Sequence, residues 1–595
     1  MNKLILMTAV LFSVSSWAQI SETMPLPEAL TMPCAMNILN GKMIFVANSS
    51  VHGKELWTTD GTLEGTTLLK EINNDYNIAV LSAFTYTNSQ DAEGYFGILN
   101  DSKMFFQATS TYGGTPTLWV TDGTTDGTTR FTIPGAALLD VRWFKEFNGR
   151  LYFTARTVAN GIEIWSTDGT VAGTSMLKEI NPGNGNAFET AYNPGFFIHN
   201  NKLWFKANDG THGIELWSTD GTAAGTSMLF DLHQGSTSDP ANKDAFKWGT
   251  VYNDRPFVNV GNYFYFAAYV NWAEYGGYQL LFKSDGTASG TVPVDAAPTL
   301  NGSIPKYYSP SPMTMLDGNA YFFSATIAYD GGTQSGLWKL NPQTQAITFV
   351  KSVSGYGDNG LSDGLPKGAM REFNGKLYFI GKGAGDDYHF WSTDGTANGT
   401  QKIFQPNNSS IDSFNTQVYM RSIVFEGKLY FVGGRYASEN VYSTDGTTAG
   451  TLPVFSTTMV AGPYQFTKFG SDQGRNSNET NRNTPSASLY FATSHNLTYE
   501  MWRLRQDNSM AIAAENFKEA KVYPNPSKGM VNLSLKNEIS NGKVQLVNLM
   551  GQELFNKNNL EGKDFHFDFS GQPSGIYMLH LQSDSGNLTQ KILLQ

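Results

Sequence analysis

The chain has 595 residues and a formal net charge of −11, and only 16% of its residues are charged while 13% are aromatic. This composition excludes an intrinsically disordered chain, and the acidic balance excludes the cationic surface that a nucleic-acid-binding protein needs. The length exceeds what one hydrophobic core supports, so we expect several domains or a repeat array. The 60 glycines favour strands joined by tight turns.

The N-terminal residues 1–18 predict a signal peptide. Lys3 supplies a positive start, and the apolar stretch from Leu4 to Val14 is too short to span a bilayer. Small residues before the end of this segment predict cleavage between Ala18 and Gln19. No later apolar run reaches the length of a transmembrane helix, so we expect an exported chain without a transmembrane segment.

Cys34 is the only cysteine of the chain. An intrachain disulfide is therefore impossible, although an exported protein reaches an oxidising environment. We expect Cys34 to be a small residue within a strand and the fold to be stabilised by packing.

The middle of the chain repeats one unit. The pattern Asp-Gly-Thr-x-x-Gly-Thr occurs seven times, with an aromatic residue three positions before each Asp, and it begins at Asp60, Asp122, Asp168, Asp220, Asp285, Asp394 and Asp445. A turn followed by a short apolar run occurs nine times, and these runs begin at Met43, Met104, Leu151, Leu203, Phe264, Tyr321, Leu377, Leu429 and Leu489. The spacing of about 56 residues is typical of propellers and solenoids.

Each repeat is consistent with four strands, which in the fourth repeat cover residues 195–199, 203–207, 214–219 and 227–232. The second of these strands is apolar at consecutive positions, so neighbouring structure must cover both of its faces. Radially packed blades provide that cover and protect most strand edges. The sequence therefore predicts an all-β chain, with a β-propeller of eight or nine four-stranded blades over residues 19–512.

The Asp-Gly-Thr motif has two interpretations. In the structural one, Asp accepts backbone N–H groups of its own turn, Gly adopts a positive φ, Thr enters the next strand and the aromatic residue packs between blades. The alternative is a metal or phosphate site, but each loop offers one carboxylate and no helix follows it. We favour the structural role and predict no metal and no cofactor.

The two signatures together resemble the ELWxxDGTxxGT-repeat proteins, which are known from secreted and surface proteins of Bacteroidota. The resemblance covers residues 41–451, and the repeats around Trp338 and Trp502 depart from the pattern. It implies no particular activity and no catalytic residue.

The irregular loops are the predicted recognition surface. In a blade, the loops between strands two and three share a face with the connections between blades, opposite the regular turns, and irregular loops on a rigid scaffold commonly bind ligands. Aromatic residues suited to stacking on sugars or protein side chains occur in these loops, and the alternative is that they pack the loops down. The candidate ligand-binding residues are Tyr112, Trp272, Tyr275, Tyr329, Tyr388 and Tyr436.

Signatures of known enzyme classes are absent from the sequence. It contains no His-Glu-x-x-His, no Gly-x-Ser-x-Gly and no Walker loop, and we predict no catalytic residue. One alternative stays open, namely a secreted polysaccharide-active enzyme in which loop carboxylates form an acid/base pair at the channel mouth. The carboxylates concerned are Glu274, Asp330, Asp386, Asp387 and Glu439.

After a polar linker at 513–520, residues 521–595 predict a small Ig-like β-sandwich, with apolar and polar residues alternating from Val531 to Leu535. This tail resembles the C-terminal sorting domain (type A) of the type IX secretion system. The matching elements are Tyr523-Pro-Asn-Pro-Ser527, Gly529, Asn548-Leu-Met-Gly-Gln-Glu553, Ser574-Gly-Ile-Tyr577 and the end that begins at Lys591. The resemblance implies export across the outer membrane and removal of the tail by a sortase-like peptidase.

These observations predict a secreted or cell-surface propeller that functions in extracellular recognition or adhesion. Its expected partners are the type IX secretion machinery with its peptidase and an extracellular glycan or protein ligand. We expect a monomer that is released or anchored at the outer-membrane surface.

Overall fold

The structure is a computed structural model in which every regular element of the described residues is a β-strand, and no helix occurs among them. The chain divides into two compact units, of which the larger comprises residues 23–469 and 489–503 and the smaller contains the C-terminal residues 504–595. The described residues are 19–23, 30–73, 94–111, 114–190, 193–233, 243–246, 257–269, 279–294, 306–308, 311, 313–327, 333–355, 370–383, 388–403, 422–435, 438–454, 466–469, 488–495, 498–506, 520–548, 553–583 and 586–595.

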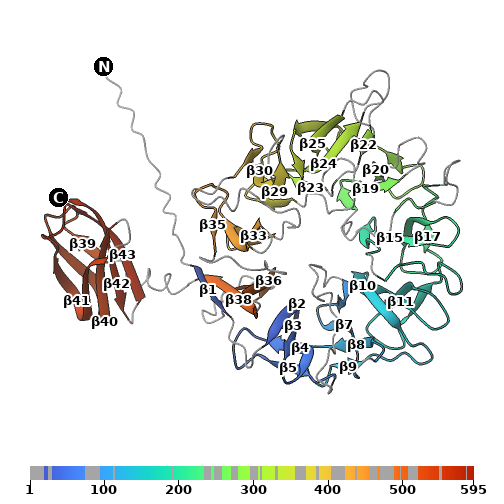
Figure 1. The fold of residues 1–595 in the computed structure, drawn as a ribbon, viewed down its shortest axis with the longest axis horizontal. Coiled ribbons are helices and arrows are strands. Elements are labelled where there is room, and N and C mark those ends of the chain that lie inside the picture. The colour runs from blue at the N-terminus through green and yellow to red at the C-terminus, as the bar shows by residue number, and fades with distance from the viewer. Residues whose placement is uncertain are drawn as a thin grey trace. The chain divides into compact units, whose positions relative to one another are not determined.

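The strands of the repeat array form four-stranded antiparallel blades that follow one another around a ring (Figure 1). The first four blades are β2 (Thr31–Leu39), β3 (Lys42–Ser49), β4 (Gly53–Thr59) and β5 (Thr67–Lys70); β6 (Phe96–Leu99), β7 (Lys103–Ala108), β8 (Thr117–Thr121) and β9 (Thr129–Arg130); β10 (Leu139–Phe147), β11 (Arg150–Arg156), β12 (Glu163–Thr167) and β13 (Ser175–Lys178); and β14 (Phe197–His199), β15 (Lys202–Asn208), β16 (Ile214–Thr219) and β17 (Ser227–Met228).

Blades five and six belong to one continuous sheet, because the short strand β22 (Lys306–Tyr308) pairs with a strand of each. Their own strands are β18 (Val258–Val260), β19 (Tyr263–Tyr269), β20 (Gln279–Ser284) and β21 (Val292–Pro293), then β23 (Thr314–Leu316), β24 (Asn319–Ile327), β25 (Thr333–Leu340) and β26 (Ile347–Lys351).

The last three blades complete the array. They consist of β27 (Ser354–Gly355), β28 (Arg371–Phe373), β29 (Lys376–Lys382), β30 (Tyr388–Thr393) and β31 (Gln401–Lys402); β32 (Ser422–Phe425), β33 (Lys428–Arg435), β34 (Ser438–Thr444) and β35 (Leu452–Pro453); and β36 (Phe466–Phe469), β37 (Ser488–His495) and β38 (Thr498–Gln506), whose sheet also contains β1 (Gln19–Thr23). The described residues thus form nine blades, and the predicted all-β propeller of eight or nine blades is confirmed.

The hydrophobic core of the ring lies between blades. In strand β11 three consecutive residues, Leu151, Tyr152 and Phe153, are at most 1% exposed, which requires cover on both faces of the sheet. Cover comes from the neighbouring blades, since one cluster contains Tyr152 and Ile164 of blade three together with Trp217 of blade four. The ring closes by the same kind of contact, because another cluster joins blades nine and one.

The two sequence signatures meet at four of the boundaries between blades. A side chain at Gly395 of blade seven would place its Cβ 2.1 Å from the hydroxyl oxygen of Tyr321 in blade six, and Gly395 has a φ of +88°. The same approach, at 2.7–2.8 Å, brings a tyrosine hydroxyl to the first glycine of the motif in three further blades, at Gly61, Gly221 and Gly446. Both the backbone conformation and the close aromatic ring therefore require glycine here.

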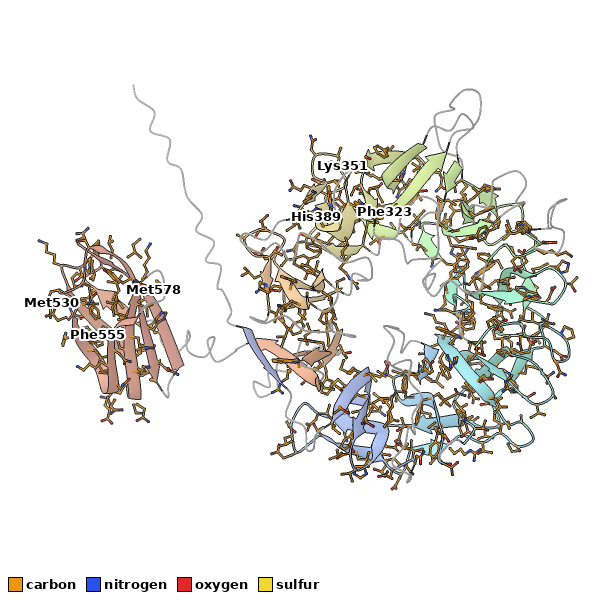
Figure 2. All side chains as sticks on the ribbon, in the orientation of Figure 1. Phe323, Lys351, His389, Met530, Phe555 and Met578 are labelled. Atoms are coloured by element: carbon orange, nitrogen blue, oxygen red, sulfur yellow. The ribbon has the colours of Figure 1, made fainter. Side chains whose placement is uncertain are left out.

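Cations of the preceding blade donate to the same turns. Lys103 Nζ donates to the carbonyl of Gly169 at 2.9 Å, and Arg503 donates to that of Gly61 at 2.8 Å. Lys351, labelled in Figure 2, donates to the carbonyl of Thr400 at 2.7 Å. The boundaries at Gly61, Gly169 and Gly395 thus combine a close side-chain contact with a charge-assisted hydrogen bond.

Blade six lacks the Asp-Gly-Thr motif but keeps the contact. Its turn is closed by Asn341, whose side-chain oxygen accepts the amides of Gln343 and Thr344, both at 3.0 Å. Tyr265 of blade five donates its hydroxyl to Gln345 Oε1 of this turn at 2.6 Å. A different turn chemistry thus serves the same boundary.

The C-terminal domain is built from two long strands that take part in both halves of one sheet. Strand β40 pairs with β41 along its length, with β39 near its start and with β42 near its end. The strands are β39 (Lys521–Tyr523), β40 (Met530–Asn548), β41 (Glu553–Asp568), β42 (Gly575–Ser583) and β43 (Gly586–Leu594). Val531, Leu533 and Leu535 alternate into a separate core, as the sequence predicted.

The Pro-Asn-Pro-Ser segment of this domain covers the edge of its last strand. Asn525 donates to the carbonyl of Lys591 at 2.7 Å and accepts the amide of Leu593 at 2.9 Å, so its side chain pairs with β43 as a strand would. Ser527 continues the pairing through two backbone hydrogen bonds at 2.8 Å. The motif therefore protects an edge that would otherwise be open.

Gly395→Ala should destabilise the propeller far more than Gly375→Ala. Both glycines have positive φ, which costs about 1–2 kcal/mol for Ala, but a Cβ at Gly375 meets nothing within 4 Å. At Gly395 the Tyr321 hydroxyl adds an overpacking cost of about 1–3 kcal/mol. Chemical denaturation of both variants measures the difference, and equal losses would contradict the proposed boundary contact.

Candidate functional site

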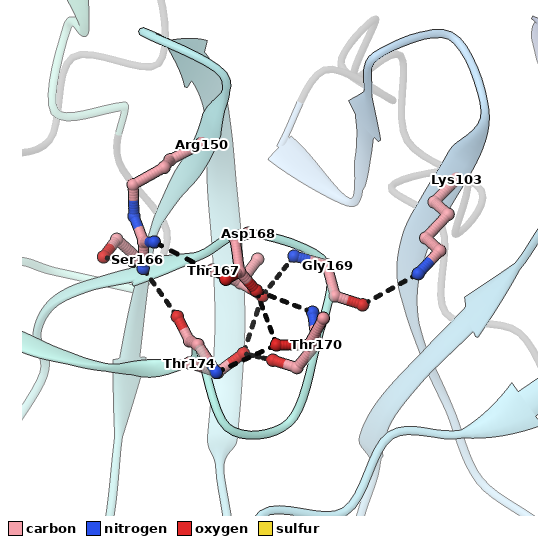
Figure 3. A network of polar contacts seen from close by, with 9 residues as sticks. Lys103, Arg150, Ser166, Thr167, Asp168, Gly169, Thr170 and Thr174 are labelled. Carbon is pink, nitrogen blue, oxygen red and sulfur yellow. Dashed lines mark hydrogen bonds and ion pairs between the residues drawn. The ribbon is translucent and has the colours of Figure 1, made fainter.

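The turn face, which carries the regular turns, contains a hydrogen-bond network within the Asp-Gly-Thr motif, shown for the motif at Asp168 in Figure 3. Asp168 Oδ1 accepts the amide of Thr170 at 2.9 Å and its hydroxyl at 2.7 Å, and Thr170 Oγ1 in turn accepts the amide of Gly173 at 2.9 Å. Thr167 Oγ1 accepts the amide of Gly169 at 2.9 Å and lies 2.6 Å from Thr174 Oγ1. The donors of the turn are therefore satisfied by the turn itself.

The second glycine of the motif is also explained by this geometry. A Cβ at Gly173 would lie 2.0 Å from Asp168 Oδ2, because the carboxylate lies directly against the glycine backbone. The hydrogen bonds from Thr170 hold the pKa of Asp168 below its usual range. The same Asp-to-Thr hydrogen bonds occur in all seven motifs, at Asp60, Asp122, Asp168, Asp220, Asp285, Asp394 and Asp445.

Three buried glutamates occupy the opposite, loop face, where strand three begins and the connection to the next blade leaves strand four. Glu55, Glu163 and Glu215, here called the loop-face glutamates, are 0% exposed. Each stands two positions before the Trp of its blade. The Trp belongs to the repeat signature recognised in the sequence, whereas the Glu was not predicted, although the repeated Glu-Leu/Ile-Trp triplet is a signal for it.

Each loop-face glutamate accepts the amides of two consecutive residues in the connection. Glu55 Oε1 accepts both Ile72 N at 3.1 Å and Asn73 N at 2.8 Å, while its Oε2 is buried without a hydrogen-bond partner. Glu163 accepts one amide with each oxygen: Oε2 lies 2.7 Å from Ile180 N and Oε1 lies 2.9 Å from Asn181 N. The connections are thereby tied to the first residues of strand three.

In blade four, Glu215 accepts the amides of Leu232 at 3.0 Å and His233 at 3.3 Å. Burial raises the pKa of Glu55 to about 8, of Glu163 to about 7 and of Glu215 to about 9, against the opposing effect of these amides. Burial is the largest cause in all three, because the protein interior disfavours the charged form of a carboxyl group.

Short segments of two connections insert between neighbouring blades on this face. Ala187 donates its amide to Ile162 of blade three at 2.9 Å and accepts the amide of Asn208 of blade four at 3.0 Å. Ala245 occupies the corresponding place between blades four and five and accepts the amide of Tyr269 at 2.8 Å. The loop face of blades three to five is thus hydrogen-bonded across the blade boundaries.

The predicted ligand-binding side chains of Tyr112, Trp272, Tyr275, Tyr329, Tyr388 and Tyr436 lie outside the described residues, and only the backbone of Tyr388, in β30, is described. The same holds for the candidate carboxylates Glu274, Asp330, Asp386, Asp387 and Glu439, of which only the Glu439 backbone, in β34, is described. Ala18 also lies outside them, and Gln19 begins β1. The described residues contain no set of three His, Cys, Asp or Glu side chains that could hold a metal ion.

Asp168→Ala should lower the free energy of unfolding by about 1–2 kcal/mol, because the amide and hydroxyl of Thr170 lose their acceptor. Thermal or chemical denaturation measures the loss. Asp126, exposed in the turn of blade two, provides the matched control, since Asp126→Ala should change stability by less than about 0.5 kcal/mol. A large drop in melting temperature on calcium chelation would contradict the structural role of the motif.

Glu163→Gln should cost more stability than Glu55→Gln at pH 5. Gln can supply one acceptor, which suffices at position 55, where both amides share Oε1, but leaves one amide unpaired at position 163. The unpaired amide costs about 1–3 kcal/mol, whereas Glu55→Gln should be nearly neutral. Denaturation of both variants at this pH is the measurement, and the reverse order would contradict the geometry.

Comparison with solved structures finds only remote similarity to other proteins, of which three follow. Puromycin hydrolase matches with 14% identity and a TM-score of 0.31, over 70% of this chain and 61% of that one. The β-propeller domain of the Trilobed protease from Pyrococcus furiosus matches with 8% identity and a TM-score of 0.28, over 61% and 98%. Trypanosoma rangeli sialidase matches with 10% identity and a TM-score of 0.23, over 77% and 89%. At this similarity no activity is transferred.

No curated protein matches this chain. No helix in the described part of the chain is long and apolar enough to cross a membrane. Residues 521–595 match the family described as the secretion system C-terminal sorting domain. The C-terminal domain of this chain thus carries the sequence of a secretion-system sorting domain, which marks the protein for secretion.

Proposed function

We propose that this protein is a secreted or surface-displayed propeller that recognises an extracellular glycan or protein ligand through its loop face, and that the type IX secretion system exports it. The observation that carries the proposal is the joining of a sorting domain at 521–595 to a ring of blades with two unlike faces. A sorting domain explains how the chain reaches the outside, and the ring provides a rigid scaffold there.

The two faces differ in hydrogen bonding and in loop length, and this difference supports recognition on the loop face. On the turn face the polar groups of each motif are engaged with one another, as the Asp168 network illustrates. On the loop face the connections differ in length, since residues 71–95 join blades one and two while residues 131–138 join blades two and three. Loops that vary on a fixed scaffold are the usual carriers of specificity.

Two loop tips also expose apolar side chains on this face. Val158, between strands two and three of blade three, is 85% exposed, and Val51 occupies the corresponding loop of blade one at 49%. Five of the six candidate aromatic residues belong to the same class of loops in the sequence, whereas Tyr388 begins strand β30. Apolar contacts of this kind suit a sugar ring or a protein side chain.

The proposed division of the chain is a signal peptide at 1–18, the propeller at 19–512, a linker at 513–520 and the sorting domain at 521–595. The C-terminal domain has its own hydrophobic core, so its removal leaves the core of the propeller intact. We propose that a sortase-like peptidase cleaves in the linker and releases the propeller or transfers it to the surface.

Deleting residues 521–595 should leave a folded propeller trapped in the periplasm, because a signal peptide alone delivers a chain only that far. Cell fractionation and immunoblotting measure its location. Grafting 513–595 onto an unrelated secreted domain should send that domain to the surface or medium, shortened near the linker, while the ungrafted domain stays in the periplasm. Normal surface delivery of the truncated chain would contradict the sorting assignment.

Binding of the propeller, residues 19–512, to arrays of extracellular glycans and proteins tests recognition. Val158→Glu, a loop-face change, should weaken binding about tenfold, or 1.4 kcal/mol. Leu63→Glu on the turn face, at a residue that is 42% exposed, provides the matched control and should leave binding unchanged. Sensitivity to the turn-face variant alone, or turnover in a screen on complex polysaccharides, would contradict the proposal.

A further inference from the structure

We propose that the loop-face glutamates Glu55, Glu163 and Glu215 form a pH-sensitive device that holds the connections leaving blades one, three and four when protonated and loosens them when ionised. The inference depends on the proposed function in one respect, because it assigns pH control to the face that is proposed to bind the ligand. The arrangement of the three glutamates is given by their hydrogen bonds and their burial.

The same arrangement is built three times, which makes it a feature of the fold. In each of these three blades a fully buried carboxyl accepts the amides of two consecutive residues in the connection. Blade two lacks the carboxyl, because Thr117 stands at the corresponding position. Blade two therefore serves as an internal control that has no buried glutamate at this position.

The charged groups around the three carboxyls are predominantly acidic. Glu71 acts on Glu55, Glu179 acts on Glu163 and Asp231 acts on Glu215, and each raises the pKa of its neighbour. The carboxylates of Glu71 and Glu179 are engaged elsewhere, with His52 and Asn160. None of these groups offers the positive charge that would stabilise a buried carboxylate.

Two further titratable groups lie beside Glu215. The ring of His233 is 1% exposed, with both nitrogens unpartnered, while its backbone amide donates to Glu215. Asp244 accepts the amide of Ile214 at 2.9 Å, so its carboxylate is already occupied. Burial, with Asp231 nearby, raises the pKa of Glu215 to about 9, the highest of the three.

Burial determines the direction of the effect. An ionised carboxyl without a counter-ion is costly inside the protein, so ionisation is favoured where the connection opens and water reaches the group. The closed pKa values of about 7 to 9 lie above the ordinary value of 4.5. The closed state therefore binds more protons between these limits, and opening becomes easier as pH rises, by up to tenfold per pH unit, until the closed pKa is passed.

Amide hydrogen exchange of the full mature chain tests the proposal directly, because the reporters are the donor amides themselves. After correction for intrinsic exchange, protection of Asn73, Asn181 and His233 should fall up to tenfold per pH unit from pH 5 and level off near pH 8, 7 and 9 respectively. Phe131 of blade two donates to the carbonyl of Leu118 at 2.8 Å, so its protection should stay constant.

The matched variant is Glu55→Gln, which keeps one acceptor for both amides and removes the titration. It should make the protection of Asn73 independent of pH while Asn181 keeps its dependence. A persisting pH dependence at Asn73, or an equal fall at Phe131, would overturn the proposal. Should the variant fail to fold, infrared spectroscopy of the wild type decides, because the proposal requires a protonated carboxyl band at pH 7 and a fully ionised set would overturn it.

Because exchange is measured without any ligand, a failure of this test leaves the recognition proposal untouched. Conversely, an absence of binding on the arrays would leave the exchange result standing. The two proposals are therefore tested separately.

Discussion

The fold depends on one recurring contact, the approach of an aromatic ring from one blade to the first glycine of the Asp-Gly-Thr turn of the next. At blades six and seven a Cβ on Gly395 would lie 2.1 Å from the Tyr321 hydroxyl, so the turn must have no side chain there. Each blade is apolar on both faces and is stable only when both are covered. The stability of the ring therefore depends on the contacts between blades. The contact recurs where blade nine meets blade one, at Tyr490 and Gly61, and so it also closes the ring.

This constraint separates the two faces of the ring. The turn face repeats because the Asp and Thr side chains of each motif are hydrogen-bonded within their own turn. The loop face is free to vary in length, but its connections are tied by the loop-face glutamates in blades one, three and four. A rigid, repeated turn face and a loop face whose variable connections are held by buried glutamates together suit the proposed presentation of a binding surface outside the cell.

The repeated apolar runs and turns were sufficient to predict the propeller, because consecutive burial in strands such as β11 leaves few alternatives to radial packing. The sorting domain followed from short motifs such as the one around Asn525. Glu55, Glu163 and Glu215 were missed because a glutamate in a strand pattern usually faces solvent, and only the fold shows that this position faces the departing connection. The ligand site could not be predicted, since it depends on how loops of unrelated sequence converge.

A double-mutant cycle between Tyr321 and Gly395 tests the central claim most directly, because it measures whether the two signatures of the repeat interact across a blade boundary. Tyr321→Phe removes the atom nearest to the added Cβ and leaves a ring carbon at 2.9 Å. Gly395→Ala should therefore cost about 1 kcal/mol less in the Tyr321→Phe background than in the wild type, a coupling typical of residues in contact. Additive losses, within about 0.5 kcal/mol, would contradict the account.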